Sequence, residues 1–353
     1  MRKVYVVVPD GIDDPTRPSG GNSYDRQLCR GLTAIGWSVH EHAVQGSWPR
    51  PDRTECAALA GALAAVPDGA VVLLDGLIAS SVPDVLVPES GRLRLVVLVH
   101  MPLGAKGPGD DHPSTREHAT LAAASAILTT STWTRDQLLD RYALDPRRIH
   151  VAEPGADPSE LAPGTASGGE LLCVAAVTPE KGYDVLVEAL AAITDLAWHC
   201  VCVGALDREP RFVDRLRRRA LESGIGGRVR FTGPRTGADL AAAYTEADVL
   251  VLASRAETYG MVVTEALARG LPVIAAAVGG LPDALGHDAD QNRPGLLVEP
   301  GDPQAFAGAL RRWLGDAELR QRLRRSAVER RSALSSWSTT SDQVSRVLAE
   351  VAP

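Results

Sequence analysis

The sequence predicts an α/β protein built from two doubly wound domains, each a parallel sheet covered by helices. The chain has 353 residues, which is more than one hydrophobic core usually serves. Strand-like and helix-like segments alternate along it, and 45% of its residues are hydrophobic. Runs such as 95–99 and 249–252 are apolar at every position, as buried parallel strands are.

The first half begins with a strand, because Val4, Val6, Val7 and Val8 follow each other almost without interruption. Apolar runs and helix-like periodicity then alternate up to Val151. The expected elements are strand 3–9, helix 22–35, strand 38–44, helix 54–65, strand 70–75, strand 94–100, a helix near 114–124, strand 126–130, helix 132–141 and strand 149–152.

Residues 154–169 are rich in Pro, Gly, Ser and Ala, so we expect them to link the two domains. A second series of strands and helices follows, with a helix-like stretch through 194 after Lys181. Its expected strands are 171–177 and, approximately, 197–203, 228–232, 248–252, 272–276 and 295–298.

These patterns predict domains at 1–160 and 161–335, followed by a C-terminal helix at 336–353. That helix is headed by Trp337 and carries Val344, Val347, Leu348 and Val351 on one side. It either crosses back to the first domain or caps the second.

Composition restricts the class of partner. A net charge of −7 argues against a nucleic-acid-binding protein, whose domain would normally be basic. Arginine clusters at 215–219 and 324–331 fit solvated helix faces, with peripheral contact to an anionic membrane as the alternative. The five scattered cysteines and the lack of a signal-peptide layout favour a reducing cytoplasm.

The most informative stretch is 254–266, where a loop after an apolar strand leads into helix-forming residues. It carries Glu257 and, eight residues later, Glu265. A helical path with a rise of about 1.5 Å per residue would separate them by roughly 12 Å. That spacing is too wide for one metal ion and wider than the roughly 5–9.5 Å of paired glycosidase carboxylates. It suits a long ligand with a sugar at one end, a ribose at the other and phosphates between them.

With its surroundings, this stretch resembles glycosyltransferase family 4, whose members carry two glutamates separated by seven residues. The resemblance continues through Thr178-Pro179-Glu180-Lys181-Gly182, Val278-Gly279-Gly280-Leu281-Pro282-Asp283 and Gly295-Leu296-Leu297-Val298-Glu299-Pro300-Gly301-Asp302. It implies the GT-B fold, two Rossmann-like domains facing a central cleft. The donor would bind mainly to the second domain and the acceptor mainly to the first.

The resemblance also implies roles for individual residues. Lys181 would neutralise the donor diphosphate, Glu257 would accept hydrogen bonds from the sugar, and Glu265 would hold the ribose hydroxyls. His100, at the end of an apolar strand, would line the reaction centre. The implied catalytic residues are His100, Glu257 and Lys181, and the donor-binding residues are Gly20, Gly21, Lys181, Glu257, Tyr259, Gly260, Met261, Val262 and Glu265.

The chain departs from the family at Ala176, where an arginine usually stands five residues before the lysine. A second phosphate cation would then be missing or be supplied by Arg255, Arg135 or Lys106. Carboxylates considered for the acceptor side are Asp13, Asp14, Asp110 and Asp111. The pair Asp288 and Asp290 matches an Asp-x-Asp metal motif, but it lies in a polar loop, and we interpret the match as incidental.

The resemblance therefore predicts a retaining glycosyltransferase that needs no metal and moves a hexose-type sugar from a UDP- or GDP-sugar to a hydroxyl. The acceptor stays open among small molecules, lipid-linked carriers and natural-product scaffolds. Two alternatives remain: a sugar-nucleotide epimerase of the same fold, and a non-catalytic protein that binds sugar nucleotides.

Overall fold

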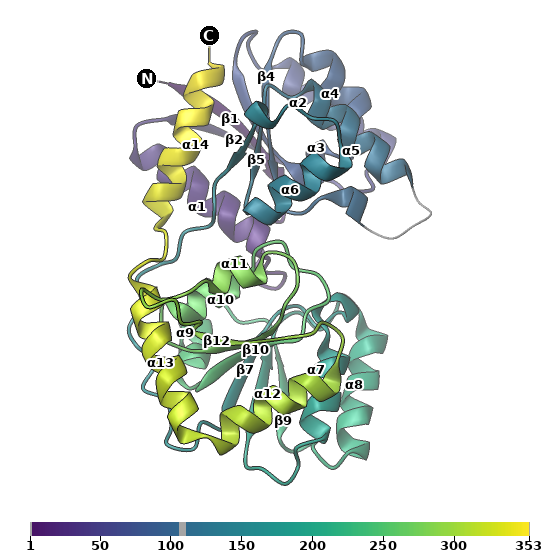
Figure 1. Cartoon of the computed structure of the whole chain (residues 1–353). Helices are drawn as coiled ribbons and strands as arrows, with labels where there is room; N and C mark the ends of the chain where they lie inside the picture. Colours follow the sequence, from purple (N-terminus) through teal and green to yellow (C-terminus); the bar gives the residue numbers. More distant parts are fainter. Residues whose placement is uncertain (1, 106–110, 353) are drawn as a thin grey trace. The chain divides into compact units, whose positions relative to one another are not determined.

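The structure is a computed structural model that describes residues 2–105 and 111–352. The chain divides into two compact units (Figure 1). The first contains residues 1–14, 19–155 and 335–353, and the second contains residues 15–18 and 156–334. Each is built around a six-stranded sheet whose paired strands all run parallel.

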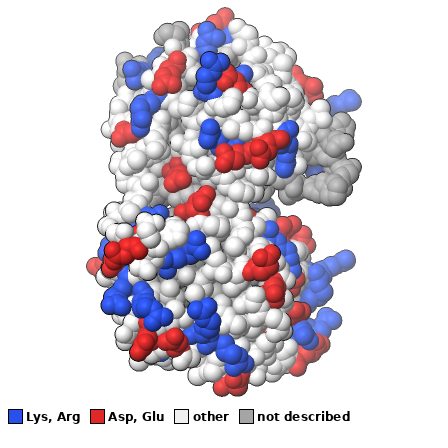
Figure 2. Space-filling model, in the orientation of Figure 1, with Lys and Arg blue, Asp and Glu red and all other residues white. Residues whose placement is uncertain are grey.

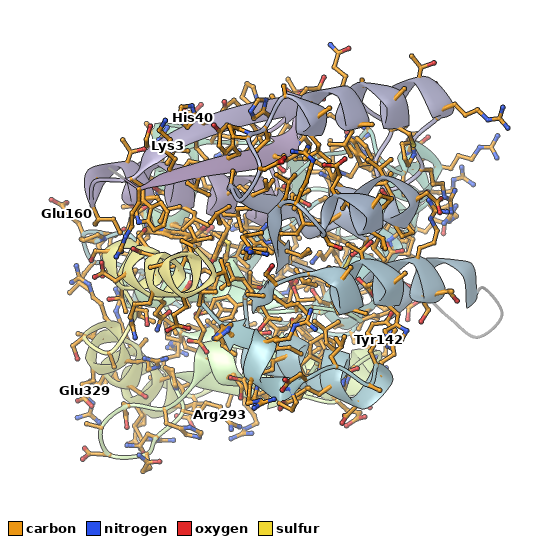
Figure 3. The ribbon with its side chains drawn as sticks, turned by 90° about the horizontal axis from the view of Figure 1, so that it is seen from above. Lys3, His40, Tyr142, Glu160, Arg293 and Glu329 are labelled. Atoms are coloured by element: carbon orange, nitrogen blue, oxygen red, sulfur yellow. The ribbon has the colours of Figure 1, made fainter. Side chains whose placement is uncertain are left out.

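The first unit has the strand order β2-β1-β3-β4-β5-β6. Its strands are apolar runs, and every residue of β3 and β5 is buried, as a sheet covered on both faces requires. Figure 3 labels Lys3 and His40 on the paired strands β1 and β2. The strands are β1 Lys3–Pro9, β2 Ser38–Val44, β3 Val71–Asp75, β4 Arg94–Val99, β5 Ala126–Thr129 and β6 Ile149–Val151.

Helices of the first unit bury leucines against the sheet, among them Leu59, Leu86, Leu121 and Leu138. The helices are α1 Gly20–Ala34, α2 Arg53–Ala64, α3 Gly76–Ala79, α4 Pro83–Glu89, α5 Asp111–Ala123, α6 Thr132–Arg141 and α14 Trp337–Val351, with short 3-10 turns η1 Leu103–Ala105 and η2 Pro146–Arg148.

The C-terminal helix α14 packs against α1 inside the first unit. Its residues Val344 and Leu348 are buried, and the Trp37 indole N–H donates to Ser345 Oγ at 2.8 Å. A Cβ at Gly31 would lie 1.9 Å from Ser341 Oγ, so the two helices approach closely there. The first unit is thus completed by residues from both ends of the chain.

The second unit has the strand order β12-β11-β10-β7-β8-β9, so the chain reverses its direction across the sheet between β7 and β10. Its core contains apolar side chains from the strands and from the helices on both faces. The strands are β7 Glu170–Val174, β8 His199–Val203, β9 Val229–Gly233, β10 Val249–Leu252, β11 Val273–Ala276 and β12 Gly295–Val298.

Helix α7 contacts α8 and α12 in the second unit, while α10 contacts α11 and α13. The 3-10 turn η3 Pro179–Lys181 precedes the first of them. The helices are α7 Tyr183–Ala191, α8 Pro210–Glu222, α9 Gly237–Thr245, α10 Met261–Leu267, α11 Leu281–Leu285, α12 Pro303–Gly315 and α13 Ala317–Arg331.

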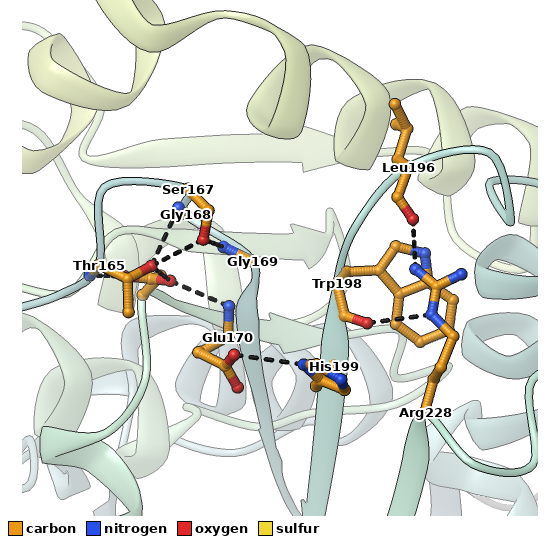
Figure 4. Close-up of polar contacts among 10 residues, drawn as sticks. Thr165, Ser167, Gly168, Gly169, Glu170, Leu196, Trp198, His199 and Arg228 are labelled. Carbon is orange, nitrogen blue, oxygen red and sulfur yellow. Dashed lines mark hydrogen bonds and ion pairs between the residues drawn. The ribbon is translucent and has the colours of Figure 1, made fainter.

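The expected linker at 154–169 contains no helix or strand, but most of it is anchored to the second unit. Thr165 donates from its backbone N–H and its hydroxyl to the Asp248 carboxylate. The turn that joins Thr165 to Gly169 is closed by hydrogen bonds to the Thr165 and Ser167 hydroxyls (Figure 4).

The predicted elements of the first unit differ from the structure between β3 and β4 and at the start of α1. Two short helices, α3 and α4, occupy the segment between β3 and β4 that the sequence had left unassigned. The first begins because the Asp75 carboxylate accepts the Leu77 N–H, and the second begins with Pro83 at its first position. Helix α1 begins at Gly20 and not at residue 22, since Ser19 caps it by accepting the Asn22 N–H.

Charged side chains of both signs are interspersed over the face shown in Figure 2. The arginines of α8 lie opposite its buried residues, Phe212, Val213, Leu216 and Ala220. Of the five cysteines, all free thiols, four are buried. Within residues 2–105 and 111–352, no helix combines the length and the apolar character needed to cross a membrane.

Candidate active site

Lys181 and Glu257 follow neighbouring strands of the second sheet. Lys181 lies in the turn after β7, and Glu257 lies in the loop after β10. The chain reverses its direction across the sheet between these two strands. In open α/β sheets, ligands bind outside the carboxyl ends of the strands at such a reversal. Lys181 and Glu257, both predicted for the site, therefore lie where sheets of this architecture bind their ligands.

These two side chains form an ion pair. Lys181 Nζ donates to Glu257 Oε2 at 2.6 Å, and the side chains are 28% and 18% exposed. Charge-assisted hydrogen bonds of this length are among the strong ones in proteins. Both groups thus remain within reach of a ligand while each neutralises the other.

Arg255 fastens the turn that carries Lys181. Its guanidinium donates two hydrogen bonds of 2.7 Å to the Asp184 carboxylate and one of 2.7 Å to the Pro179 carbonyl. A Cβ at Gly182, where φ is +65°, would lie 1.8 Å from the Ala253 carbonyl oxygen. The turn after β7 is therefore held directly against the chain that leaves β10.

Three cations were considered as replacements for the arginine absent at Ala176. Arg255 is engaged by Asp184, which makes it part of the scaffold. Arg135 belongs to the first unit and lies 3.7 Å from Asp136. Lys106 lies outside the described residues.

Two glycines, Gly279 and Gly280, pack against the backbone of the loop around Glu257. A Cβ at Gly279, where φ is +58°, would lie 1.6 Å from the Glu257 carbonyl oxygen, which also accepts the Gly280 N–H at 3.1 Å. Tyr259 is buried, and Gly260 precedes Met261 and Val262, the first residues of α10. Because α10 begins at Met261, Glu257 lies in the loop before it and Glu265 lies in the helix, as predicted. The separation of roughly 12 Å, which assumed a helical path over all eight residues, does not apply.

Glu265 points toward a partner that sequence reasoning missed. The Tyr244 hydroxyl of α9 donates to Glu265 Oε2 at 2.7 Å, and Arg269 lies over the Tyr244 ring. Burial raises the pKa of Glu265, and the Tyr244 hydrogen bond works in the opposite direction. No motif singles out Tyr244, since it lies within an alanine-rich helix.

In the first unit, His100 directly follows β4 and meets two buried carboxylates. His100 Nε2 lies 2.8 Å from Asp25 Oδ1 and 3.9 Å from Asp75 Oδ2. Asp25 belongs to α1, and Asp75 is the last residue of β3. Neither was predicted, although an aspartate that ends the apolar run 71–75 was a usable signal.

Gly20 and Gly21 were expected in a loop beside the donor. They form the first turn of α1 instead, because Ser19 begins the helix. A Cβ at Gly21 would lie 3.3 Å from His100 Cδ2. Gly21 therefore makes room for the imidazole, and a donor contact at either glycine remains a prediction.

Of the acceptor-side carboxylates, Asp13 forms an ion pair with Arg26 at 2.6 Å. The Asp14 backbone N–H donates to the Gly11 carbonyl. Asp110 and the Asp111 side chain lie outside the described residues. Asp288 Oδ1, from the Asp-x-Asp match with Asp290, accepts two backbone N–H groups of its own loop.

Comparison with known proteins identifies relatives. The family described as glycosyl transferases group 1 matches residues 167–330. The D-inositol 3-phosphate glycosyltransferase of Jonesia denitrificans is 34% identical over 244 residues, which are 62% of this chain and 57% of the relative. D-inositol 3-phosphate glycosyltransferase 1 of Catenulispora acidiphila is 32% identical over 289 residues, 76% of this chain and 67% of the relative. The chain spans 50% to 57% of the length of the first relatives that it matches.

Solved structures with the same fold superpose on almost the whole chain. Sucrose-phosphate synthase from Thermosynechococcus elongatus superposes with a TM-score of 0.83, at 23% identity and over 99% of both chains. Anabaena HepE in complex with UDP-glucose superposes with a TM-score of 0.78, at 19% identity, over 99% of this chain and 100% of that one. The chain belongs to the glycosyl transferases group 1 family, glycosyltransferase family 4, and has the GT-B fold.

Proposed function

We propose that the protein transfers a hexose-type sugar from a UDP- or GDP-sugar to an acceptor hydroxyl, with retention of configuration and without a metal ion. The observation that carries the proposal is the ion pair of Lys181 with Glu257, at the reversal of strand order in the second sheet. Support for the donor comes from the fold neighbour that was solved with UDP-glucose.

In this proposal the donor separates the two charges. The diphosphate replaces Glu257 as the partner of Lys181, and the sugar hydroxyls replace Lys181 as the partners of Glu257. Both exchanges substitute one charge-assisted contact for another, so neither charge is left unpaired. As the bond to the sugar breaks, negative charge grows on the leaving diphosphate, and a preorganised ammonium at that point stabilises it.

Glu265 would hold the other end of the donor. Its carboxylate would accept hydrogen bonds from the ribose hydroxyls, and the Tyr244 hydroxyl fixes the position of one of its oxygens. The start of α10 would lie along the phosphates, with Gly260, Met261 and Val262 supplying backbone N–H groups. His100, in the first unit, would serve the sugar side of the reaction.

The names of the relatives make an inositol phosphate the first acceptor to test. Acceptor specificity resides in loops and is not set by the fold. A lipid-linked carrier and a natural-product scaffold are the next two classes. Such acceptors would have to offer a hydroxyl group near the donor sugar.

The experiment is incubation with a panel of UDP- and GDP-sugars, with and without inositol phosphate. Release of the nucleoside diphosphate that depends on the acceptor supports transfer. An epimeric sugar would indicate isomerisation, and binding without turnover would indicate a sensor. Lys181→Ala and Glu257→Ala should abolish most turnover, while Lys3→Ala and Glu329→Ala, at exposed positions labelled in Figure 3, serve as matched controls.

A further inference from the structure

Three titratable side chains meet at the carboxyl edge of the first sheet. Asp25 comes from the helix after β1, Asp75 ends β3, and His100 follows β4. These strands are adjacent in the order β2-β1-β3-β4, and the chain reverses its direction across the sheet between β1 and β3. One oxygen of each carboxylate and one ring nitrogen of His100 all lie within 4.8 Å of one another.

The cluster has a charge imbalance. Asp25 is 3% exposed and Asp75 is 5% exposed, and the two carboxylates share a single neighbouring imidazole. Even with His100 as an imidazolium, two ionised carboxylates would carry one more negative charge than the imidazole balances. The Leu77 N–H, which Asp75 accepts, offsets part of that buried charge, and the remainder is unfavourable. One proton placed on either carboxyl group removes the imbalance.

The distances decide which carboxyl group keeps its charge. His100 Nε2 is 1.1 Å closer to Asp25 than to Asp75, at 2.8 Å against 3.9 Å. Asp25 is thus the counterion, and Asp75 is the group that takes the proton. Asp25 Oδ2 is buried and has no hydrogen-bond partner within residues 2–105 and 111–352, so it is available to accept that proton's hydrogen bond.

The charged groups that face His100 are Asp25 from α1 and Asp75 from β3. The ring of Tyr24, also on α1, packs edge-to-face with the His100 ring, with the ring centroids 5.3 Å apart, while the Tyr24 hydroxyl donates to the Ala152 carbonyl. Burial lowers the pKa of His100, but the charge and hydrogen bond of Asp25, together with Asp75, outweigh burial and raise the pKa to about 9. Burial and the Asp25 charge raise the pKa of Asp75 to about 7.

We propose that Asp25 and Asp75 are positioning residues that hold His100 as an imidazolium, with Asp25 ionised and Asp75 carrying a proton. His100 is then a fixed positive charge and not a general base. Its importance for catalysis rests on the proposed function, whereas its protonation state does not.

Gly21 provides the space that the His100 imidazole occupies beside α1. Gly21, Tyr24 and Asp25 lie on one face of α1, three and four residues apart. Tyr24 and Asp25 contact the His100 ring, and Gly21 leaves room for it. A Cβ at Gly21 would lie within 3.4 Å of two ring carbons. The first two turns of α1 therefore both orient His100 and supply its counterion.

The test is an NMR titration of the histidine rings in the full chain. The His100 signal is identified by its absence from His100→Gln, with His40→Gln as the control for the assignment. We expect the His100 pKa to lie at least about one unit above the ordinary value of about 6.5. An imidazole with a pKa at or below that value would overturn the proposal without any variant of the aspartates.

Asp25→Asn and Asp75→Asn form a matched pair, because both replace a buried carboxyl group with an isosteric amide. We expect Asp25→Asn to lower the His100 pKa by more than about one unit and Asp75→Asn to leave it raised. Equal effects of the two variants would contradict the assignment of charge to Asp25. Circular dichroism of both variants monitors folding.

Sugar transfer then gives an independent measurement. We expect Asp25→Asn to lower kcat at least about tenfold with little change in the donor KM, and to lower it by a larger factor than Asp75→Asn does. If no sugar nucleotide is turned over by the wild type, the proposed function fails. The titration result still stands or falls by itself, because it needs neither donor nor acceptor.

Discussion

Lys181 Nζ lies 2.6 Å from Glu257 Oε2, so the two residues expected to hold opposite ends of a sugar phosphate form an ion pair with each other. They are separated by 76 residues and come from loops after the adjacent strands β7 and β10. The pair neutralises both charges in a partly buried place, and a ligand that separates them has to supply a new partner for each.

Replacing Lys181 by alanine should lower kcat/KM for donor turnover by a factor of about 10² to 10³, as for other lost groups that stabilise developing charge. Lys181→Arg keeps the charge but changes the shape of the donor group, so we expect partial activity. Initial rates of nucleoside diphosphate release measure this. A Lys181→Ala rate within about threefold of Lys3→Ala would be inconsistent with a phosphate role.

Glu257→Gln should separate binding of the nucleotide from binding of the sugar. Without its carboxylate partner, Lys181 is free, so a nucleoside diphosphate should bind equally well or more tightly than to the wild type. The affinity for the full sugar nucleotide should fall relative to the affinity for the nucleoside diphosphate, because the charge-assisted contacts to the sugar are lost. Calorimetric titration with both ligands measures this ratio, and an unchanged ratio would argue against a sugar contact at Glu257.

Tyr244→Phe removes the hydroxyl that donates to Glu265 Oε2 at 2.7 Å. The carboxylate then loses a fixed position, and its pKa should rise further, because burial already raises it and the hydrogen bond opposes that rise. We expect the donor Kd to increase by a factor of about 10 to 150, from a lost hydrogen bond to a charged group. Tyr5→Phe, in the first unit, is the control, and equal Kd values for the two variants would refute the link to Glu265.

Arg255→Ala should loosen the turn that carries Lys181, since the guanidinium ties Pro179 and Asp184 together. Because Arg255 acts on position and not on the ligand, the effect should be smaller than that of Lys181→Ala. Donor turnover with both variants, and their double variant, checks this. Additive losses would mean that the arginine does not act through Lys181.

Asp75 should make stability depend on pH. Its pKa is raised from 3.8 to about 7, so between these values the folded state holds a proton that the unfolded state has lost. Stability from this group is therefore present below about pH 4 and falls as pH rises toward 7. Relative to Asp75→Asn, the free energy of unfolding of the wild type should fall by up to about 1.4 kcal/mol per pH unit.

Urea unfolding of both proteins between pH 4.5 and 7.5 measures that slope. Asp75→Asn is a matched reference for the wild type, because its amide oxygen can still accept the Leu77 N–H at the start of α3. Parallel pH profiles for the two proteins would show that Asp75 titrates normally.

Sequence patterns predicted the two parallel sheets and most of their strands, because buried strands such as β10 and β11 are continuous apolar runs. They also placed Lys181 and Glu257 after strands, where parallel sheets bind ligands. These successes rest on local composition and on short motifs, which a single sequence displays directly.

The partners of the predicted residues were not predictable in the same way. Asp25 is 75 residues from His100, and Tyr244 is 21 residues from Glu265, so tertiary packing creates both contacts. The start of α1 was misplaced because glycines are poor helix formers, whereas the Ser19 cap outweighs that preference. The role of Arg255 was not predictable either, because its contacts with the turn after β7 depend on how that turn packs against the chain that leaves β10.

The most direct measurement is a crystal structure of the protein with a bound sugar nucleotide. The proposed function predicts the diphosphate at Lys181, the sugar at Glu257 and the ribose at Glu265, with the Lys181–Glu257 contact broken. A donor bound away from these three residues, or an ion pair that persists at 2.6 Å beside the bound donor, would contradict it.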